Sequence, residues 1–332
     1  MSDIFAFDSA ACPPEDAFAQ YSKLYGVGTD VERTGAPFFA RVRSWRLERT
    51  LLFMRDYGGV RHFRRGRIER DGFDHFVLHY VVSGELLGGP ADKAVPVAPG
   101  ETLLLDTTEP MESGASAVQL ITVSIARDAV RSAAGSLDGL HGHLIRAREG
   151  ALLGSLLREL VEQASHLPPG AHAAVTRTIV DLLSVAINPA GMGGRSEFYR
   201  LEHVRRESVQ RLIEANIAEP ELSVQAIVST TGISRASLYR MFESQGGVAR
   251  YMQLCRLEHL RDRLDDRSFD DRSIAVLAPR SGFSGESHAG RLFKQLFGVS
   301  PGAYRAASIR EAQDPSIDLM LRRIHGSLVE LR

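Results

Sequence analysis

Two arginines stand at matching positions in the C-terminal part of the sequence, each two residues before a phenylalanine. Arg240 precedes Phe242, and Arg291 precedes Phe293. Residues two apart in a helix point to different faces, so a buried phenylalanine would leave the arginine projecting outward. Such a guanidinium can donate two hydrogen bonds to guanine O6 and N7, or it can simply remain solvated. The nearby Lys294 carries a compact charge that suits a phosphate.

A pattern that recurs at an offset of 50 residues would position these side chains. Each copy has an N-cap serine, a short apolar helix, a glycine turn, and a second N-capped helix that ends at glycine. This is the layout of a helix-turn-helix motif, although a single helix pair of this kind is usually plain packing. Two motifs joined by a helix from about Val248 to Leu264 can reach successive major-groove turns about 34 Å apart. The matching residues are Ser223 and Ser273, Val224 and Ile274, Ile227 and Leu277, Val228 and Ala278, Gly232 and Gly282, Ile233 and Phe283, Ser234 and Ser284, and, after one inserted residue, Gly247 and Gly298.

Two segments of this region resemble the DNA-binding domain of AraC/XylS-type transcription regulators. They are LSVQAIVSTTGISRASLYRMFESQ and IAVLAPRSGFSGESHAGRLFKQLFGVSPGAYR, and the second carries the signature GF-x-x-x-SH-x-x-R-x-FK-x-x-FG-x-SP-x-x-YR almost intact. The resemblance covers roughly residues 204–310 and extends more loosely to VAPGETLLLDTTEP in the N-terminal half. It implies an N-terminal sensory domain and a C-terminal double helix-turn-helix. The implied partners are double-stranded DNA, a small-molecule effector, RNA polymerase and a second copy of the chain.

The resemblance also implies which side chains face the groove. Two features of the second copy depart from an ideal helix pair: Pro279 removes a backbone donor inside the first helix, and Gly290 costs about 1 kcal/mol in the second. We therefore expect the second copy to be the looser one. The groove-facing positions are Arg235, Ala236, Tyr239 and Arg240 in the first copy and Glu286, Ser287, Gly290 and Arg291 in the second, with Lys294 near the phosphate backbone.

The N-terminal half has a different periodicity. Short strand-like runs between Pro37 and Ser124, separated by Gly, Pro and Asp turns, predict a cupin-like antiparallel β barrel. From 151 to 187 the apolar period becomes helical and predicts an antiparallel helix pair. We predict a sensing and dimerisation domain at 1–187, a linker at 188–202, a DNA-binding domain at 203–312 and a helical extension at 313–332.

A barrel of this size has room for one small ligand. In HFVLHYVVSG, Phe76, Leu78 and Tyr80 share one face and Val77 and His79 share the other, so the sequence leaves open which face is inward. Either set of side chains can instead be plain core. The aromatic and titratable candidates for binding the effector are Trp45, His62, His79 and Tyr80.

An enzymatic function is the alternative, because barrels of this kind often hold metals. His75 and His79 lie four residues apart on a strand, about 13 Å, which is too far to share one metal. His141 and His143 form an HxH pair, but no strand pattern or partner carboxylate frames it. No Ser/His/Asp or glycine-rich phosphate motif stands out, so we expect no cofactor, no metal and no turnover. The alternative is a cupin-like enzyme fused to a DNA-binding module.

Composition and charge set the remaining limits. The acidic N-terminus lacks the features of a secretory signal, and Cys12 and Cys255 are the only cysteines, so a cytoplasmic protein is expected. Residues 195–312 hold 18 basic and 15 acidic side chains, against 19 and 23 in residues 1–194, a weak indication of an anionic partner.

The prediction is a ligand-responsive, DNA-binding activator. Its helix pair either forms a dimer seam or packs on its own barrel through Leu153, Leu156, Leu157, Leu160, Ile179, Leu182 and Leu183.

Overall fold

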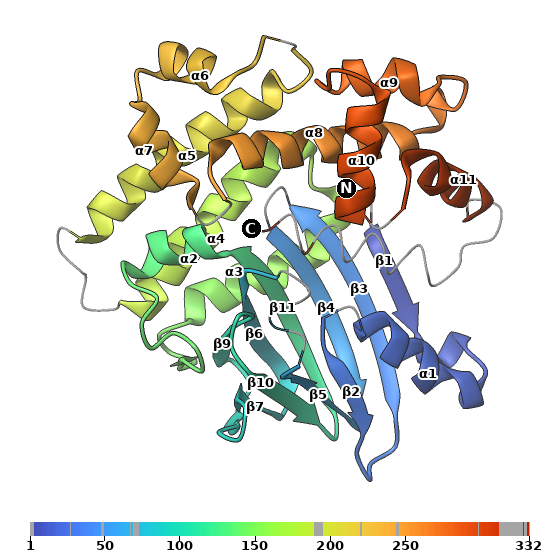
Figure 1. Cartoon of the computed structure of the whole chain (residues 1–332). Helices are drawn as coiled ribbons and strands as arrows, with labels where there is room; N and C mark the ends of the chain where they lie inside the picture. Colours follow the sequence, from blue (N-terminus) through green and yellow to red (C-terminus); the bar gives the residue numbers. More distant parts are fainter. Residues whose placement is uncertain are drawn as a thin grey trace. The chain divides into compact units, whose positions relative to one another are not determined.

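The computed structural model divides into two compact units (Figure 1). The first unit contains Met1–Arg200 together with Met320–Arg332, and the second contains Leu201–Leu319. The structure describes residues 3–26, 28–47, 50–66, 68, 73–188, 195–219, 221–243, 246–297, 299–311, 328 and 331. No helix within these ranges has the length and the apolar character needed to cross a membrane.

The predicted linker and the predicted C-terminal extension are described only in part. Residues 189–194 of the predicted linker lie outside the described residues, and α5 (Arg195–Ala215) begins directly after them. The predicted extension at 313–332 also lies outside them, apart from Leu328 and Leu331. Leu331 is only 1% exposed, and both leucines belong to the first unit. The chain therefore returns to its N-terminal unit after it has built the C-terminal one.

Twelve strands in the described part of the N-terminal unit form two antiparallel sheets. The predicted antiparallel architecture is confirmed, with the difference that the strands form two sheets instead of one closed barrel. In spatial order, the larger sheet contains β1 (Asp3–Asp8), β3 (Phe39–Leu47), β4 (Thr50–Gly58), β11 (Val118–Ala126), β6 (His75–Gly84), β9 (Thr102–Asp106) and β12 (Leu144–Ile145). The smaller sheet contains β2 (Asp30–Arg33), β5 (Val60–Arg64), β10 (Met111–Ala115), β7 (Leu86–Pro90) and β8 (Val95–Val97).

Strand β6 at the centre of the larger sheet is buried on both faces. Leu78 and Tyr80 point into a core that also contains helices, whereas Val77 and His79 line a cavity on the opposite face. Side chains on a strand alternate between the two faces, so this assignment holds along the whole strand. The face that carries His79 is the inward one.

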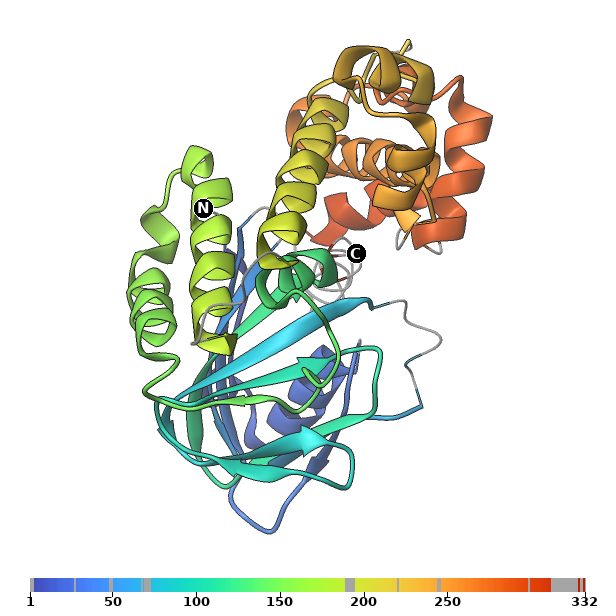
Figure 2. The same cartoon turned by 90° about the vertical axis from the view of Figure 1, so that its left-hand side faces the viewer.

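Three helices cover the outer face of the larger sheet: α2 (Arg127–Ala134), α3 (Ala151–Gln163) and α4 (His172–Ile187), the last two drawn in green in Figure 2. Their apolar stripes pack on the sheet, as expected for surface helices. Of the two alternatives for these apolar side chains, the structure shows packing on the unit's own sheet, and dimerisation stays a prediction. Leu153, Leu157, Leu160, Ile179 and Leu183 are buried there, and Leu156 and Leu182 pack against it half-buried.

The C-terminal unit contains the two predicted copies of one helix pair, which confirms the repeat (Figure 1). The first copy is α6 (Val224–Thr231) and α7 (Arg235–Met241), and the second is α9 (Ile274–Arg280) and α10 (Glu286–Phe297). Between them runs α8 (Val248–Asp265), and α11 (Pro301–Glu311) follows. Helix α8 supplies Met252 and Cys255 to the core of the first copy and Leu260 and Leu264 to that of the second. A single helix thus connects the two cores.

The helix ends differ between the copies. The Ser223 and Ser234 hydroxyls accept the predicted N-cap hydrogen bonds from Ala226 N and Ser237 N, both 3.2 Å long. Between them Gly232 takes the left-handed conformation (φ +69°) that ends α6. In the second copy, the Ser273 side chain makes no cap bond, and α10 begins at Glu286, two residues after the predicted cap.

Ser284 has a different hydrogen bond from the predicted one. Its hydroxyl pairs with His288 Nδ1 at 3.1 Å, so it does not cap the backbone. Pro279 lies one residue before the end of α9, where the missing N–H removes only one hydrogen bond of the last turn. Gly298, the predicted closing glycine, lies outside the described residues.

Candidate functional site

The second helix of the first copy, α7, has one buried and one exposed side. Leu238 packs into the core, while Arg235, Ala236, Tyr239 and Arg240 are exposed. These four positions are spaced i, i+1, i+4 and i+5, which is one face of a helix. The Arg235 guanidinium lies 5.8 Å from the centre of the Tyr239 ring. The four side chains predicted to face a groove therefore form one continuous exposed surface.

Helix α10 presents a similar surface in the second copy. Ala289 and Phe293 are buried, whereas Glu286, Ser287, Arg291 and Lys294 are exposed. Gly290 is half-buried between them, and a Cβ atom added there would meet no other atom within 4 Å. The exposed face of α7 and that of α10 are together called the recognition faces below.

The cations of the recognition faces are available for an external anion. Within the described residues, Arg240, Arg291 and Lys294 take part in no ion pair and no hydrogen bond. Their guanidinium and ammonium groups are exposed to water. Arginine on a projecting helix can bind base edges or phosphates, and lysine binds phosphates as a point charge.

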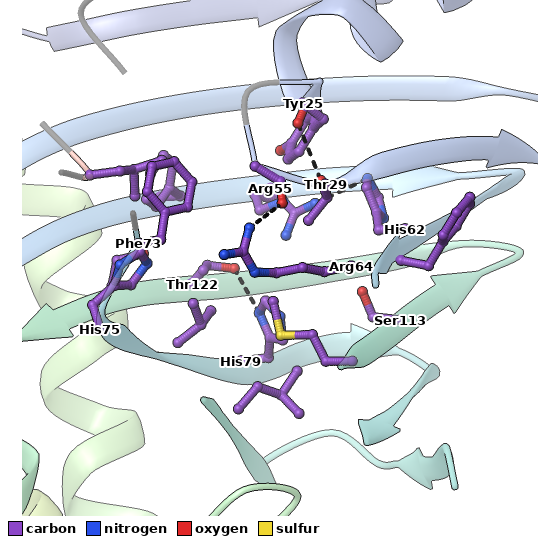
Figure 3. Close-up of a pocket in the computed structure, with 18 of the residues that line it drawn as sticks. Tyr25, Thr29, Arg55, His62, Arg64, Phe73, His75, His79, Ser113 and Thr122 are labelled. Atoms are coloured by element: carbon purple, nitrogen blue, oxygen red, sulfur yellow. Dashed lines mark hydrogen bonds between the residues drawn. The ribbon is translucent and has the colours of Figure 1, made fainter. Parts of the chain in front are cut away.

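A second site lies inside the N-terminal unit, where a cavity of about 130 Å³ separates the two sheets (Figure 3). The larger sheet contributes side chains from β4, β6 and β11, and the smaller sheet contributes β5 and β10. Helix α1 (Pro14–Tyr25) and the segment after it form another wall, and Leu328 adds a side chain from the C-terminal tail. Polar lining residues are Tyr25, Thr29, Arg55, His62, Arg64, His75, His79, Glu112, Ser113, Thr122 and Ser124.

Arg55 is the most unusual group in this cavity. It is only 5% exposed, and its guanidinium carbon lies 4.8 Å from the centres of the Tyr25 and Tyr57 rings. Its Nη2 donates to His62 Nε2 over 3.4 Å, and Nε has no hydrogen-bond partner. Burial acts to lower the pKa of Arg55, but the phenols of Tyr25, Tyr57 and Tyr21 raise it above its ordinary value. The group therefore keeps its positive charge.

A second buried arginine, Arg64 on β5, donates hydrogen bonds to two backbone carbonyls at the wall of the cavity. Its Nε donates to the carbonyl of Thr107, and its Nη1 donates to the carbonyl of Gly28, each over 2.7 Å. The ring of Phe73 lies 5.2 Å from its guanidinium carbon. These bonds fix the Arg64 side chain in the wall of the cavity (Figure 3).

The histidines of the cavity are neutral at physiological pH. Burial is the largest cause and lowers the pKa of both His75 and His79 to about 3, with further lowering by Arg64 and Arg127 at His75 and by Arg55 at His79. Burial and Arg55 also hold the pKa of His62 well below its ordinary value. Neutral imidazoles add hydrogen-bonding atoms without adding charge.

The four predicted effector-binding residues fall into two groups. His62 and His79 line the cavity, and the His79 Nδ1 atom lies 3.0 Å from the Thr122 hydroxyl (Figure 3). Trp45 and Tyr80 lie in the core on the other face of the sheet, where Trp45 Nε1 donates to the Ser165 hydroxyl at 3.3 Å. The helices α2–α4, and not the ligand cavity, surround these two aromatic residues.

Sequence reasoning overlooked Arg55. The strand sequence TLLFMRDYG carries a signal for it, because Arg55 alternates with Phe53 and Tyr57 on one face of β4. A charged residue between two aromatic ones on a central strand indicates either a buried ion pair or a ligand contact. Nothing else in the sequence of this strand distinguishes a buried ion pair from a ligand contact.

The described residues contain no group of three or more His, Cys, Asp or Glu side chains arranged to hold a metal ion. The HxH pair of the sequence has a structural role at its first member. His141 Nδ1 accepts from Asp106 N at 3.1 Å, and Nε2 faces the Pro110 carbonyl at 3.2 Å. Both ring nitrogens of His141 are thus used to fix the loop against β9.

Comparison with known protein families decides the identity of the two units. Residues 22–187 match the model of the AraC-binding-like domain, and residues 227–307 match a helix-turn-helix domain. The chain belongs to the AraC family of transcription regulators. The recognition faces of this AraC-family protein lie within the second match, and almost all of its cavity lies within the first.

Similar proteins support this assignment. The transcriptional activator NphR of a Rhodococcus species is 26% identical over 253 residues, which cover 73% of each chain. The regulator MtrA of Neisseria gonorrhoeae is 32% identical over 106 residues, covering 32% of this chain and 33% of MtrA. The crystal structure of the AraC-like transcriptional activator CuxR covers 84% of this chain and 100% of its own, with a TM-score of 0.54 and 19% identity. CuxR therefore shares the fold of this AraC-family chain.

Proposed function

We propose that this protein is a transcriptional activator that binds specific DNA sequences and responds to a small molecule bound between its two sheets. The observation that carries the proposal is the pair of recognition faces. Each is an exposed helix face in a helix-turn-helix unit, and each offers an arginine without a protein partner among the described residues. The name of NphR as a transcriptional activator supports activation as the direction of control.

In this proposal Arg240 and Arg291 contact base edges, and Lys294 contacts a phosphate. The remaining exposed positions of the recognition faces shape the fit to the groove. A guanidinium that binds guanine with two hydrogen bonds contributes about 1–3 kcal/mol of discrimination, whereas a phosphate contact carries no sequence information.

The cavity serves as the effector site and acts by binding alone, without catalysis or cofactor. Of the predicted effector-binding residues, His62 and His79 line the cavity and are proposed to contact the ligand. The rival function, a cupin-like enzyme fused to a DNA-binding module, predicts chemical conversion of a bound ligand. Recovery of the ligand unchanged after prolonged incubation with the protein separates the two functions.

We further propose that the activator works in the cytoplasm as a homodimer that contacts RNA polymerase. The outer sides of α3 and α4 support a dimer contact, because Leu152 is 65% exposed and Val185 is 52% exposed there. Sedimentation of the full chain over a range of concentrations measures its oligomeric state. A monomer at all concentrations contradicts the dimer.

Selection of bound fragments from random DNA tests the proposed function directly. We expect the full chain to enrich one sequence motif, with two half-sites about one helical turn apart. The Lys294→Ala variant should weaken binding to all sequences alike and reduce the salt dependence by about one charge. Arg205→Ala on α5 removes an equally exposed charge away from the recognition faces and serves as the control. Enrichment of no motif contradicts the proposal.

A further inference from the structure

We propose that the cavity binds a compact, apolar carboxylic acid, about one ring in size, whose carboxylate pairs with the guanidinium of Arg55. The inference rests on the proposed function of the cavity as the effector site, and it names the chemical class of the effector. It follows from the charge, the free hydrogen-bonding atoms and the size of the cavity.

The charge of Arg55 has no acidic counterpart in the described residues. Burying a cation is costly unless it is paired, and a 5% exposed arginine is usually paired with a carboxylate. Glu112 is the acidic residue of the cavity lining, and it already pairs with Arg61 and lies 3.8 Å from Arg65. The three histidines that line the cavity are neutral. An anion supplied by a ligand would neutralise Arg55.

Hydrogen-bonding atoms around the cavity also remain without partners. Arg55 Nε, His62 Nδ1 and His75 Nδ1 are buried and have no partner. Most buried polar atoms in proteins do have one, so exceptions mark places where something else binds. His62 Nε2 faces the hydroxyl of Tyr21 at 2.8 Å as well as Arg55, so Nε2 is the accepting atom and Nδ1 carries the proton.

The surroundings of the guanidinium favour a carboxylate in its plane. The rings of Tyr25 and Tyr57 lie against it, which leaves the N–H groups at its edge as the available contacts. A carboxylate binds such an edge with two parallel hydrogen bonds. A phosphate could do the same, but its second negative charge would need a further cation, and Arg64 in the same cavity already donates to the carbonyls of Thr107 and Gly28.

The size and the walls of the cavity define the rest of the ligand. A cavity of about 130 Å³ is close to the roughly 150 Å³ that holds benzene in an engineered protein. Phe5, Leu24, Phe53, Val77, Leu105 and Met111 make most of its remaining wall apolar. A sugar of this size would leave several hydroxyls without partners, so a ring with a single carboxylate fits best.

The test compares acids with neutral amides of the same shape on the full chain. Benzoate, phenylacetate and cyclohexanecarboxylate are the probes, benzamide is the neutral control, and benzylphosphonate distinguishes a phosphate-like group. We expect at least one acid to bind at least about 30-fold more tightly than benzamide, measured by calorimetry. Equal binding of acid and amide, no binding of any acid, or tighter binding of the phosphonate overturns the inference.

The variant Arg55→Met separates ligand binding from a structural role. It should abolish the preference for acids over benzamide, and it should leave the thermal midpoint of the ligand-free protein unchanged or raise it, because a buried unpaired charge is removed. A lower midpoint of the ligand-free protein would assign Arg55 a structural role and contradict the inference. Arg41→Met, at an exposed arginine of β3, is the matched control. Selection of a DNA motif does not depend on these results, so the proposed function can stand if the inference fails.

Discussion

Arginines without an acidic partner among the described residues occur in both units of this protein, in opposite surroundings. Arg55 lies between aromatic rings inside the N-terminal unit, whereas Arg240 and Arg291 lie on exposed helix faces of the C-terminal unit. The exposed pair is hydrated before it binds and is screened by salt. Arg55 has already lost its water when the protein folded, so an anion that reaches it meets a strong and weakly screened field.

The difference indicates two kinds of recognition with one functional group. On the recognition faces, discrimination comes from the geometry of several weak contacts on a large partner. In the cavity, discrimination comes from the buried guanidinium of Arg55, which has no acidic partner among the described residues, and from the limited space around it. Surroundings, more than residue type, set what each arginine can select.

The largest expected effect is the pH dependence of stability, which tests whether the histidines of the cavity are neutral in the folded protein. The folded protein keeps His75 and His79 neutral because their pKa is about 3, while the unfolded chain protonates them below about pH 6.5. Stability is therefore complete above pH 6.5 and falls as the pH drops towards 3. Between pH 6.5 and 5, protonation of these two histidines in the unfolded chain should lower the free energy of unfolding by about 3 kcal/mol.

Trp45 is the single tryptophan and is buried in the N-terminal unit, so its fluorescence during urea unfolding reports on that unit alone. The His79→Asn variant should lose about a third of the pH dependence, because the pKa of His62 is held low as well as that of His75. Carboxylates do not titrate strongly in this range, which makes it a clean window for the histidines. Stability that does not change between pH 6.5 and 5 would show that the imidazoles are not held neutral.

The next largest effect is the response to salt, which should be strong for DNA binding and weak for binding of an acid in the cavity. Raising the salt concentration from about 50 to 200 mM should weaken DNA binding by about 100-fold if four phosphates are contacted. The same change should alter the affinity for a bound acid by less than about twofold, because Arg55 is buried. Anisotropy of labelled DNA and calorimetry of the acid measure the two slopes. A steep salt dependence of acid binding would mean that Arg55 is reached by solvent.

Within the exposed pair, Arg240→Ala should remove discrimination at one or two base pairs, by about 1–3 kcal/mol. Its measurement is the relative affinity for a set of single-base operator variants. Arg205→Ala, which removes the same charge from α5, should leave that ranking unchanged. An unchanged ranking in Arg240→Ala itself would assign Arg240 to the phosphate backbone instead.

The smallest effect concerns the two copies of the helix pair. Gly290→Ala should stabilise the C-terminal unit by up to about 1 kcal/mol, because the position is helical and open to a Cβ atom. With Pro279 and Gly290, the second copy should also exchange its amide hydrogens faster than the first. Hydrogen exchange on the full chain compares α10 with α7. Equal protection would remove the expected difference between the copies.

Local patterns predicted the C-terminal unit well because its signals are short-range. A serine, a glycine and apolar residues at helical spacing determine each helix pair within about 20 residues, and Gly232 and the caps of the first copy follow directly. The second copy departs from its pattern at Ser284, whose hydroxyl has a nearby histidine as an alternative partner. Competition of this kind depends on side-chain position and not on spacing alone.

The N-terminal cavity was harder to predict because its inner face is set by distant residues. Strand β6 is buried on both faces, so His79 and Tyr80 look alike in sequence, and only the packing of α2–α4 on one face distinguishes them. The helix pair shows the same limit. Its apolar stripe fits a dimer seam or the chain's own sheet equally well until the sheet is in place.

The return of the chain to its first unit has a consequence for the order in which the protein is made. Leu328 contributes to the cavity wall, yet all of residues 201–319 precede it on the ribosome. Domains generally fold as units during synthesis, N-terminal parts first. The sheets can therefore form early, but the cavity acquires its last side chain only after the DNA-binding helices have been translated. A newly made chain would have its DNA-binding unit before it has a complete effector site.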